Sequence, residues 1–386
     1  MKEKLVVIIS AAEWDGVFHR PHHFAKRFSK LDHTKVLYVE PPVTLLGPIK
    51  DPKKLIGWKK WIKKAVEVEK DLFVLAPPPT LPFGMKKPLV NKMNQQVISA
   101  EIFSFIAKNK LKNVELVLYN FLPSAADLIK NFDFIETIYD CVDDHSEFKG
   151  LINVDYINAL EKSVCEQSDV CFATAQKLLD DKIAWNSNFH LINNGADFEH
   201  FYREDKSLVK RPYDLPSNDK PIIGFVGGIG TWIDLEWIRD LSVATLDTHH
   251  IVLIGPSSVD LSILLEQGNI TYLGKKHYND LPEYYHHFNF AIMPFKIEKL
   301  TESVNPIKMY EYLAAGIPTI STDLQEARRY QDVLSIFNSG TMAAKFINEF
   351  IDTDAHRMKR EETGKNNSWN ARFEAVLSHT KTYSTK

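Results

Sequence analysis

Short apolar runs alternate with longer segments of helical periodicity in the first half of the chain. The helical segments, such as HRPHHFAKRFSKL and NALEKSVCEQSD, carry apolar residues at helical spacing. Strands that alternate with helices are typical of a parallel sheet covered by helices on both faces. The predicted strands, rich in Val, Ile and Phe, are residues 5–10, 35–39, 72–75, 116–119, 137–141, 170–173 and 190–192.

The second half of the chain repeats this alternation. Its predicted strands are PIIGFVG, HHIVLIG, NITYLG, FNFAIMPF and IPTIST. Charged residues and two prolines without periodicity lie between the halves and indicate a linker. We therefore predict two doubly wound, Rossmann-like α/β domains, residues 1–200 and 221–367, joined by residues 201–220, with a ligand cleft where the strands end. A capped amphipathic helix in residues 368–386 is expected to pack back on the first domain.

Composition narrows the classes of function. Apolar residues make up 44% of the 386 positions and charged residues 25%, which is typical of a globular protein. A net charge of −3 gives no overall field that would attract nucleic acid, and no run of about eighteen apolar residues predicts a membrane span. Cys141, Cys165 and Cys171 lack metal-ligand spacing and are expected to be reduced core residues.

The stretch ESVNPIKMYEYLAAGIPTIST, residues 302–322, predicts a polar turn, a short helix and a buried strand. Asn305 suits the N-cap, Pro306 the first helical position and Gly316 the end of the helix. The start of a helix gathers unpaired N–H groups and the positive end of the helix dipole, so it suits a phosphate. The residues expected to present N–H groups there are Ser303, Val304 and Asn305.

Two charged residues on this helix, Lys308 and Glu311, suit the two ends of a nucleotide. Lysine supplies a movable positive charge for phosphate oxygens, and a carboxylate accepts hydrogen bonds from the two hydroxyls of a ribose. The alternative is an i,i+3 ion pair on a solvated face. The Asn-Pro entrance, the Gly-x-Pro exit and the strand that follows favour the nucleotide.

This stretch resembles the nucleotide-sugar site of GT-B glycosyltransferases, especially bacterial enzymes of the family 4 type that build cell-surface polysaccharides. Four further pieces resemble the family in the same order along the chain. They are WDGVFHRPHHFAKRFSKLDHTKVLYVEPP, the domain-closing motif HLINNGADFEHF, the glycine-rich FVGGIGTWIDLEWI and, at the nucleotide base, ITYLGKKHYNDLPEYYHHFNFAIMPF. The resemblance implies two Rossmann-like domains facing a cleft, with the acceptor in the first and the donor in the second.

The resemblance also assigns roles within the donor site. Glu311 matches the second glutamate of the family's E-x7-E pair, which holds the ribose, whereas the first glutamate would fall at Ser303. Residues 231–234, Thr-Trp-Ile-Asp, replace the family's Arg and Lys after the glycine-rich loop, so Lys308 is the main candidate to neutralise the pyrophosphate. No DxD sequence follows a strand as metal-dependent transferases need. A reaction without metal or other cofactor is expected.

Two glycines and an aromatic residue complete the expected donor site. Gly227 and Gly228 end a predicted strand and let the backbone approach a ligand closely, although such turns are as often purely structural. Tyr278, after the GKKH turn, is expected to flank the nucleotide base.

Polar residues crowd two strand ends of the first domain. Those after the first strand are Asp15, His19, Arg20, His22 and His23, and we expect the four basic ones to face the acceptor. Those in IYDCVDDH are Asp140, Asp143, Asp144 and His145. Neighbouring carboxylates resist ionising together, so one raised pKa is expected. Asp143 or Asp144 is the expected general base for an acceptor hydroxyl, with Asp15 in reserve; the alternative is that these acids cap helices.

Residues 50–64 hold seven lysines and two tryptophans among apolar residues. A basic amphipathic segment with tryptophans is typical of a membrane surface site. The residues expected to contact an anionic membrane are Lys53, Lys54, Trp58, Lys59, Lys60, Trp61, Lys63 and Lys64. The alternatives are a solvated helix whose lysine stems cover its own core and, less well supported, a nucleic-acid site.

These features together predict a glycosyltransferase at the cytoplasmic face of the membrane. It would move a sugar from a nucleotide diphosphate donor, with UDP as the expected nucleotide, to a lipid-linked or polysaccharide acceptor. No nucleic-acid partner is expected. Two alternatives stay open from the sequence: a nucleotide-sugar epimerase of the same fold, and a non-catalytic relative that binds sugars or serves as a scaffold.

Overall fold

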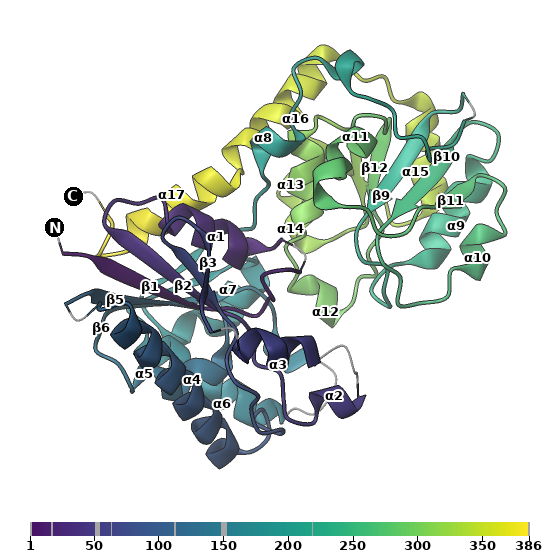
Figure 1. Cartoon of the computed structure of the whole chain (residues 1–386). Helices are drawn as coiled ribbons and strands as arrows, with labels where there is room; N and C mark the ends of the chain where they lie inside the picture. The colour runs from purple at the N-terminus through teal and green to yellow at the C-terminus, as the bar shows by residue number, and fades with distance from the viewer. Residues whose placement is uncertain are drawn as a thin grey trace. The chain divides into compact units, whose positions relative to one another are not determined.

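The computed structural model describes residues 2–16, 18–50, 55–62, 64–111, 113–147, 153–217 and 219–384. The chain divides into two compact units (Figure 1). The first unit is Met1–Ile192 with Phe373–Lys386, and the second is Asn193–Arg372. The second unit is thus inserted into the sequence of the first.

The first unit is built on an eight-stranded sheet of order β3-β4-β2-β1-β5-β6-β7-β8, in which every pairing is parallel except β3 with β4. In chain order the strands are β1 (Lys4–Ile9), β2 (Thr34–Val39), β3 (Val66–Glu69), β4 (Leu72–Leu75), β5 (Glu115–Asn120), β6 (Phe134–Cys141), β7 (Val170–Ala173) and β8 (Phe189–Leu191). The helices used below are α1 (Arg20–Phe28), α2 (Gly47–Lys50), α3 (Leu55–Ile62), α4 (Pro88–Lys108), α5 (Ala126–Ile129), α6 (Val154–Gln167) and α7 (Gln176–Lys182).

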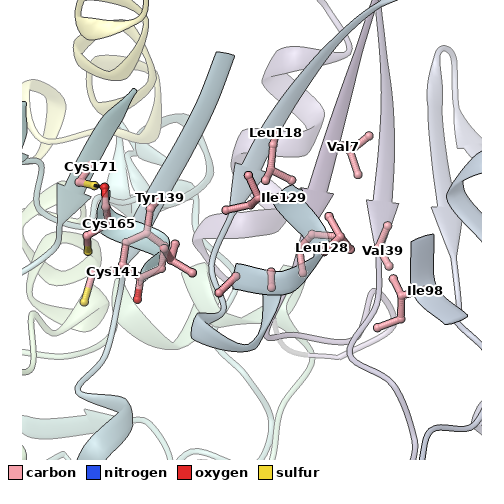
Figure 2. Close-up of a cluster of buried hydrophobic side chains, with 14 of the residues drawn as sticks. Val7, Val39, Ile98, Leu118, Leu128, Ile129, Tyr139, Cys141, Cys165 and Cys171 are labelled. Carbon is pink, nitrogen blue, oxygen red and sulfur yellow. Dashed lines mark hydrogen bonds between the residues drawn. The ribbon is translucent and has the colours of Figure 1, made fainter. Parts of the chain in front are cut away.

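Both faces of this sheet are covered, which explains why its central strands are continuous apolar runs rather than alternating ones. Val7 on β1 and Leu118 on β5 face a core that includes Ile98 of α4 and Leu128 of α5 (Figure 2). On the opposite face, the ring of Tyr119 packs against rings of α1. The three cysteines are buried as free thiols, and all belong to the hydrophobic core of the first unit, as the sequence predicts.

The second unit is built on a six-stranded parallel sheet of order β11-β10-β9-β12-β13-β14. Its strands are β9 (Ile222–Val226), β10 (His250–Ile254), β11 (Ile270–Tyr272), β12 (Phe290–Met293), β13 (Thr319–Ser321) and β14 (Leu334–Ile336). Its helices are α8 (Phe198–Phe201), α9 (Leu235–Ala244), α10 (Ser262–Leu265), α11 (Leu281–Tyr285), α12 (Lys299–Glu302), α13 (Ile307–Ala314), α14 (Gln325–Arg328), α15 (Gly340–Glu349) and α16 (Asp354–Asn366). Two hydrophobic clusters lie on its two faces, one with α11 and α13 and the other with α9 and α15. The predicted class, two Rossmann-like α/β domains, is confirmed.

The division of the chain differs from the expected boundaries. The second unit begins at Asn193, not after residue 200. Phe201 and Leu215, in the segment expected to be a linker, are buried in the core of the second unit because that segment packs on its own sheet.

The C-terminal helix α17 (Trp369–His379) begins in the second unit and ends in the first. The Phe373 ring lies edge-on to Phe28 of α1, with ring centroids 4.8 Å apart. Beyond the helix, the buried Glu136 carboxylate accepts the backbone N–H groups of Lys381 and Thr382 at 2.6 and 3.0 Å. The expected packing of this segment on the first domain is therefore present.

No helix within the described ranges has both the length and the apolar character needed to cross a bilayer.

Candidate active site

The second sheet has a topological switch point between β9 and β12, because the strands continue outward in opposite directions from this pair. Ligands of doubly wound sheets bind at the carboxyl ends of such strands. Gly227 and Gly228 follow β9 at this place. Gly255, at the end of β10, has φ +136°, and a Cβ there would lie 1.9 Å from the Gly227 carbonyl oxygen. The backbones after β9 and β10 are therefore in close contact, which only glycine allows.

The loop that follows Gly228 is bound to the end of β12. Ile233 forms an antiparallel bridge with Phe295, and the Asp234 N–H donates to the Pro294 carbonyl at 2.8 Å. This loop contains residues 231–234, which replace the basic residues of the resembled family. It is held close to the switch point without them.

Helix α13 begins at Ile307, with Pro306 as its N-cap. Asn305 is not the N-cap, because its side chain is used elsewhere. Its Oδ1 accepts the Asn194 N–H at 2.9 Å, and its Nδ2 donates to Tyr310 and Glu326 at 3.0 Å. Buried amides with several partners hold loops in fixed positions. Asn305 therefore fixes the entrance of α13 to the segment that opens the second unit.

The three backbone groups expected at this entrance are not equivalent. The Val304 N–H donates to the Thr301 carbonyl at 3.2 Å, so it is already used inside the turn. Ser303 is the C-cap of α12 and is buried. The structure brings Ser303, Val304 and Asn305 together, but the Val304 N–H is not available for a phosphate in this conformation.

Glu311 lies on α13, and the residue is 3% exposed. Its Oε2 accepts the Tyr285 hydroxyl and the Lys308 ammonium, each at 2.6 Å. Tyr285 is fully buried on α11, where its ring stacks on Phe201. The i,i+3 ion pair that the sequence left as an alternative is thus present, but its carboxylate is buried and not on a solvated face.

A second tyrosine of α13 ties the helix to the switch point. The Val226 N–H, at the end of β9, donates to the Tyr312 hydroxyl at 2.8 Å. The helix that carries Glu311 and the strand that leads to Gly227 are therefore fixed to each other. Burial raises the pKa of Tyr312, so the hydroxyl stays neutral.

Tyr278 lies after β11, as the sequence predicts, but one face of its ring is already covered by a protein side chain. Its ring stacks on His200 of α8 at 4.4 Å between centroids, and its carbonyl oxygen lies 3.0 Å from the His200 Nε2.

In the first unit, the switch point lies between β1 and β5. Arg20 is expected to face an acceptor, but its guanidinium is buried and donates from Nε to Asp140 at 2.7 Å. The Tyr119 hydroxyl donates to the same carboxylate oxygen at 2.6 Å. A buried charge needs such a partner, so Arg20 and Asp140 hold the ends of α1 and β6 together.

The three histidines at the start of α1, one of them its N-cap His19, differ in burial. His19 is exposed, whereas His22 and His23 are buried. The His22 Nδ1 accepts the His19 N–H at 3.1 Å, and its Nε2 lies 3.0 Å from the Glu13 carbonyl, which fits a neutral ring protonated at Nε2. Burial lowers the pKa of His22 to about 4. Of these histidines, His19 has the accessibility that contact with an acceptor requires.

The two acidic candidates after β6 have different surroundings. Asp144 accepts the Ser146 N–H at 3.0 Å and the Ser146 hydroxyl at 2.6 Å, so it caps a short turn, the alternative considered from the sequence. The Asp143 side chain reaches solvent. The protein around its carboxyl nevertheless shields it from water and so raises its pKa, and the nearby His145 and His19 partly oppose this effect. Asp143 therefore fits a general base better than Asp144 does.

Asp15, the reserve candidate, is largely exposed, and its carboxylate pairs with Lys60 at 2.9 Å. Lys60 also contacts the buried Glu40 at 3.2 Å. The Lys60 ammonium is therefore held by two carboxylates of its own unit.

The other described residues of the basic segment are also partly engaged. Trp58 and Trp61 are half-buried, and the Trp61 indole donates to Glu101 of α4 at 3.4 Å. Lys64 pairs with the same carboxylate at 3.6 Å, whereas Lys59 is exposed. Lys53, Lys54 and Lys63 lie outside the described residues.

Metal ligands do not gather in the described part of the chain: no three His, Cys, Asp or Glu side chains there lie together as a metal ion requires.

Comparison with known proteins shows which proteins this chain is similar to. Residues 220–351 match the family model described as Glycosyl transferases group 1. Over 98% of both chains, the sequence is 23% identical to the putative teichuronic acid biosynthesis glycosyltransferase TuaH of Bacillus subtilis (strain 168). The chain is a glycosyltransferase with the GT-B fold. This favours glycosyl transfer over the epimerase and scaffold alternatives.

Solved structures similar to this glycosyltransferase show the same fold over almost its whole length. Sucrose-phosphate synthase from Thermosynechococcus elongatus has a TM-score of 0.64 and 14% identity, covering 97% of each chain. Anabaena Alr3699/HepE in complex with UDP and glucose has a TM-score of 0.63 and 11% identity, covering 97% of this chain and 98% of its own.

Several residues that shape the candidate donor site of the glycosyltransferase were not singled out from its sequence. Tyr285 and Glu326 have no signal of their own, because their partners lie far along the chain. Asn194 had one, since it stands in HLINNGADFEHF, the stretch that resembles a domain-closing motif. Its amide also donates to the Asn305 carbonyl at 2.9 Å.

Proposed function

We propose that this glycosyltransferase takes a sugar from a UDP-sugar held by the second unit. The observation that carries the proposal is the buried Glu311 carboxylate, fixed by Tyr285 and Lys308 beside the switch point. Both of these hydrogen bonds reach Oε2, so Oε1 is directed to the ribose hydroxyls. Two solved structures of the similar protein Anabaena Alr3699/HepE, one described in complex with UDP and one with UDP and glucose, support this nucleotide.

Lys308 exchanges partners in the proposed complex. Without a donor its ammonium pairs with Glu311. When the pyrophosphate binds, the ammonium turns to the phosphate oxygens and stabilises the charge that builds up on the leaving diphosphate. The proposed reaction uses no metal because Lys308 and the start of α13 supply this positive charge.

Asp143 is the proposed general base, with His19 beside it on the acceptor side. A carboxylate removes the proton of an acceptor hydroxyl best when its pKa approaches the working pH. The raised pKa of Asp143 and its surface access support this role.

The proposed acceptor is a lipid-linked sugar or a growing polysaccharide at the cytoplasmic membrane face. The name of the Bacillus subtilis relative, which refers to teichuronic acid biosynthesis, supports a polysaccharide product. The lysines of residues 50–64 support an anionic surface nearby.

Calorimetric titration with UDP and with uridine, in buffer containing EDTA, tests the donor site. Lys308→Ala should weaken UDP binding by about tenfold or more and uridine binding much less, because only UDP carries the diphosphate. Glu311→Ala should weaken both ligands, because both contain the ribose.

The matched control is the exposed i,i+3 pair Glu236 and Arg239 of α9, in the same unit. Replacing either by Ala should leave both affinities unchanged. Folded Lys308 and Glu311 variants with unchanged affinities would refute the proposed donor site, and loss of wild-type UDP binding in EDTA would refute metal independence.

A further inference from the structure

The large apolar side chains that the first unit exposes are concentrated in one part of its sequence. Most of those that the structure describes lie between residues 45 and 103. The most exposed are Ile49 of α2 at 79% and Leu89 of α4 at 71%. A concentration of this kind marks an interaction surface, whereas single exposed apolar residues do not.

Hydrogen bonds link three of the segments that carry these side chains. Thr44 forms a parallel bridge with Thr80, and the Leu45 N–H donates to the Thr80 carbonyl at 2.8 Å. The next residue, Leu81, is bound through its N–H and its carbonyl to the Asn94 amide of α4, both at 2.9 Å. The segment leading to α2, the turn after Leu81 and the first half of α4 therefore lie side by side.

Helix α4 contributes a stripe of apolar residues on its outer side. Leu89, Met93 and Val97 are spaced by four residues and are all exposed, while Asn94 and Ile98 face inward. In the turn before the helix, Phe83 is exposed and has φ +68°, a left-handed conformation that is unfavourable for a phenylalanine. We call Leu46, Ile49, Phe83, Leu89, Met93 and Val97 the apolar face.

Lysines accompany the part of the apolar face that lies in residues 83–97. No Asp or Glu occurs in residues 72–100. Lys86, Lys87 and Lys92 are exposed, and none of them pairs with a carboxylate in the described ranges. An apolar surface bordered by lysines complements the interface of an anionic bilayer.

The tryptophans of α3 do not supply the apolar contact. Both are half-buried, and Trp61 is bound to Glu101. Among the α3 side chains that the structure describes, the exposed apolar ones are Leu55 and Ile62. Lysines alone would give binding that salt removes entirely, whereas apolar insertion resists salt.

We propose that the first unit docks on an anionic lipid bilayer by inserting the apolar face between headgroups, with Lys86, Lys87 and Lys92 contacting the headgroups around it. The proposed function gives the reason for such docking, a membrane-held acceptor, but the binding itself needs neither donor nor acceptor.

Co-sedimentation with vesicles tests this proposal. The vesicles are phosphatidylcholine alone or an equal mixture with phosphatidylglycerol, at 0.1 and 0.5 M salt. Wild-type protein should pellet with the anionic vesicles and keep part of its binding at 0.5 M salt. The triple variant Leu89→Ser, Met93→Ser, Val97→Ser should lose about tenfold or more in partition at both salt concentrations, because each buried methylene adds to interfacial binding.

Two further variants separate the apolar part from the electrostatic part. Lys86→Gln, Lys87→Gln, Lys92→Gln should lose mainly the part of binding that salt removes. The matched control Leu208→Ser, Ile351→Ser, Met358→Ser removes three exposed apolar side chains of the second unit and should bind like wild type. All three variants should melt at the wild-type temperature, because the changed side chains are exposed.

Equal binding by wild type and the triple Ser variant, or no pelleting of wild type, would overturn the proposal. So would a lipid-free wild-type dimer that the triple Ser variant converts to monomer, since the apolar face would then cover a second copy. UDP titration separates the two proposals: if vesicle binding fails while Glu311→Ala still loses UDP, only the docking proposal is refuted.

Discussion

The Glu311 carboxylate shows how a candidate site residue depends on the side chains around it. Tyr285 and Lys308 donate to the same carboxylate oxygen. In the proposed complex Tyr285 keeps this hydrogen bond, whereas Lys308 exchanges it for one to the phosphate. The sequence predicts Lys308 and Glu311 because they stand three residues apart on one helix. It does not predict Tyr285, which reaches Glu311 from a helix 26 positions earlier. Local spacing reveals residues on one element, and only the fold reveals partners on another.

The same distinction applies to the arginine and histidines of α1. Their crowding at a strand end was visible in the sequence, but the direction of each side chain was not. Arg20 turns inward to Asp140, and His23 is buried, because α1 uses that side to pack on the sheet. Arg20 and His23 are therefore buried, whereas His19 is exposed, and its contact with an acceptor stays a prediction.

At this scale we predict that Asp143 and Asp144 separate in function. Asp143→Asn should lower turnover by about 10² to 10⁴ while UDP affinity is kept. It should not lower the free energy of unfolding near pH 7, because a raised pKa means that the folded protein disfavours the charged carboxylate. Asp144→Ala should cost about 1 kcal/mol of stability, as a lost cap does, with turnover changed far less.

The pH profile of kcat/KM checks the assignment further. A base works only when deprotonated, so kcat/KM should fall as pH drops through the pKa of Asp143. The midpoint of this fall should lie above pH 3.8, the ordinary pKa of an aspartate. Wild-type turnover in Asp143→Asn would contradict the assignment. Asp15→Asn serves as the comparison for the reserve candidate.

Among the elements, buried strands were the most predictable and exposed ones the least. The predicted strands 72–75 and 170–173 match β4 and β7. Strand β3 was not predicted because all four of its residues are exposed and it pairs antiparallel at the edge of the sheet. Its Val-Glu alternation lies directly after the basic segment.

The C-terminal segment supplies a prediction at the scale of elements. Glu136→Gln should lower the free energy of unfolding of the first unit by about 1–3 kcal/mol, because the buried charged acceptor of two backbone N–H groups is lost. It should also speed hydrogen exchange at Lys381 and Thr382. Urea unfolding and exchange mass spectrometry measure the two effects.

Glu115→Gln offers a matched control, since among the residues that the structure describes this carboxylate pairs only with the exposed Lys2, at 3.4 Å, and is itself more exposed than Glu136. Its effect should stay within about 0.5 kcal/mol. Wild-type exchange at Lys381 in Glu136→Gln would show that the ring contacts of Phe373 alone hold the segment.

For the whole molecule, acid should weaken the first unit through its buried histidines. Burial holds His22 neutral, with a pKa of about 4 against an ordinary 6.5. The unfolded chain therefore binds a proton between pH 6.5 and 4 that the folded unit excludes. Stability is lost as pH falls through this range, by about 1.4 kcal/mol per pH unit for this group.

Urea unfolding of wild type and His22→Gln between pH 8 and 5 measures this contribution. Below pH 6.5, the free energy of unfolding of the first unit should fall less steeply with pH in the variant than in wild type. Above pH 7.5, the plots of this free energy against pH should run parallel for the two proteins. Equal slopes at all pH values would show that His22 takes up its proton without unfolding.

The insertion of the second unit into the first has a consequence for biosynthesis. Residues 193–372 are contiguous, so the second unit is complete as soon as its own segment has left the ribosome. The first unit begins earlier but must wait, because Glu136 and the α1 rings receive their partners from residues 373–382. Domains usually fold in the order of their N-termini. Here the order of completion is reversed. Until residues 373–382 are made, the first unit leaves the α1 rings and Glu136 uncovered, and chaperones can bind there while the second unit is already folded.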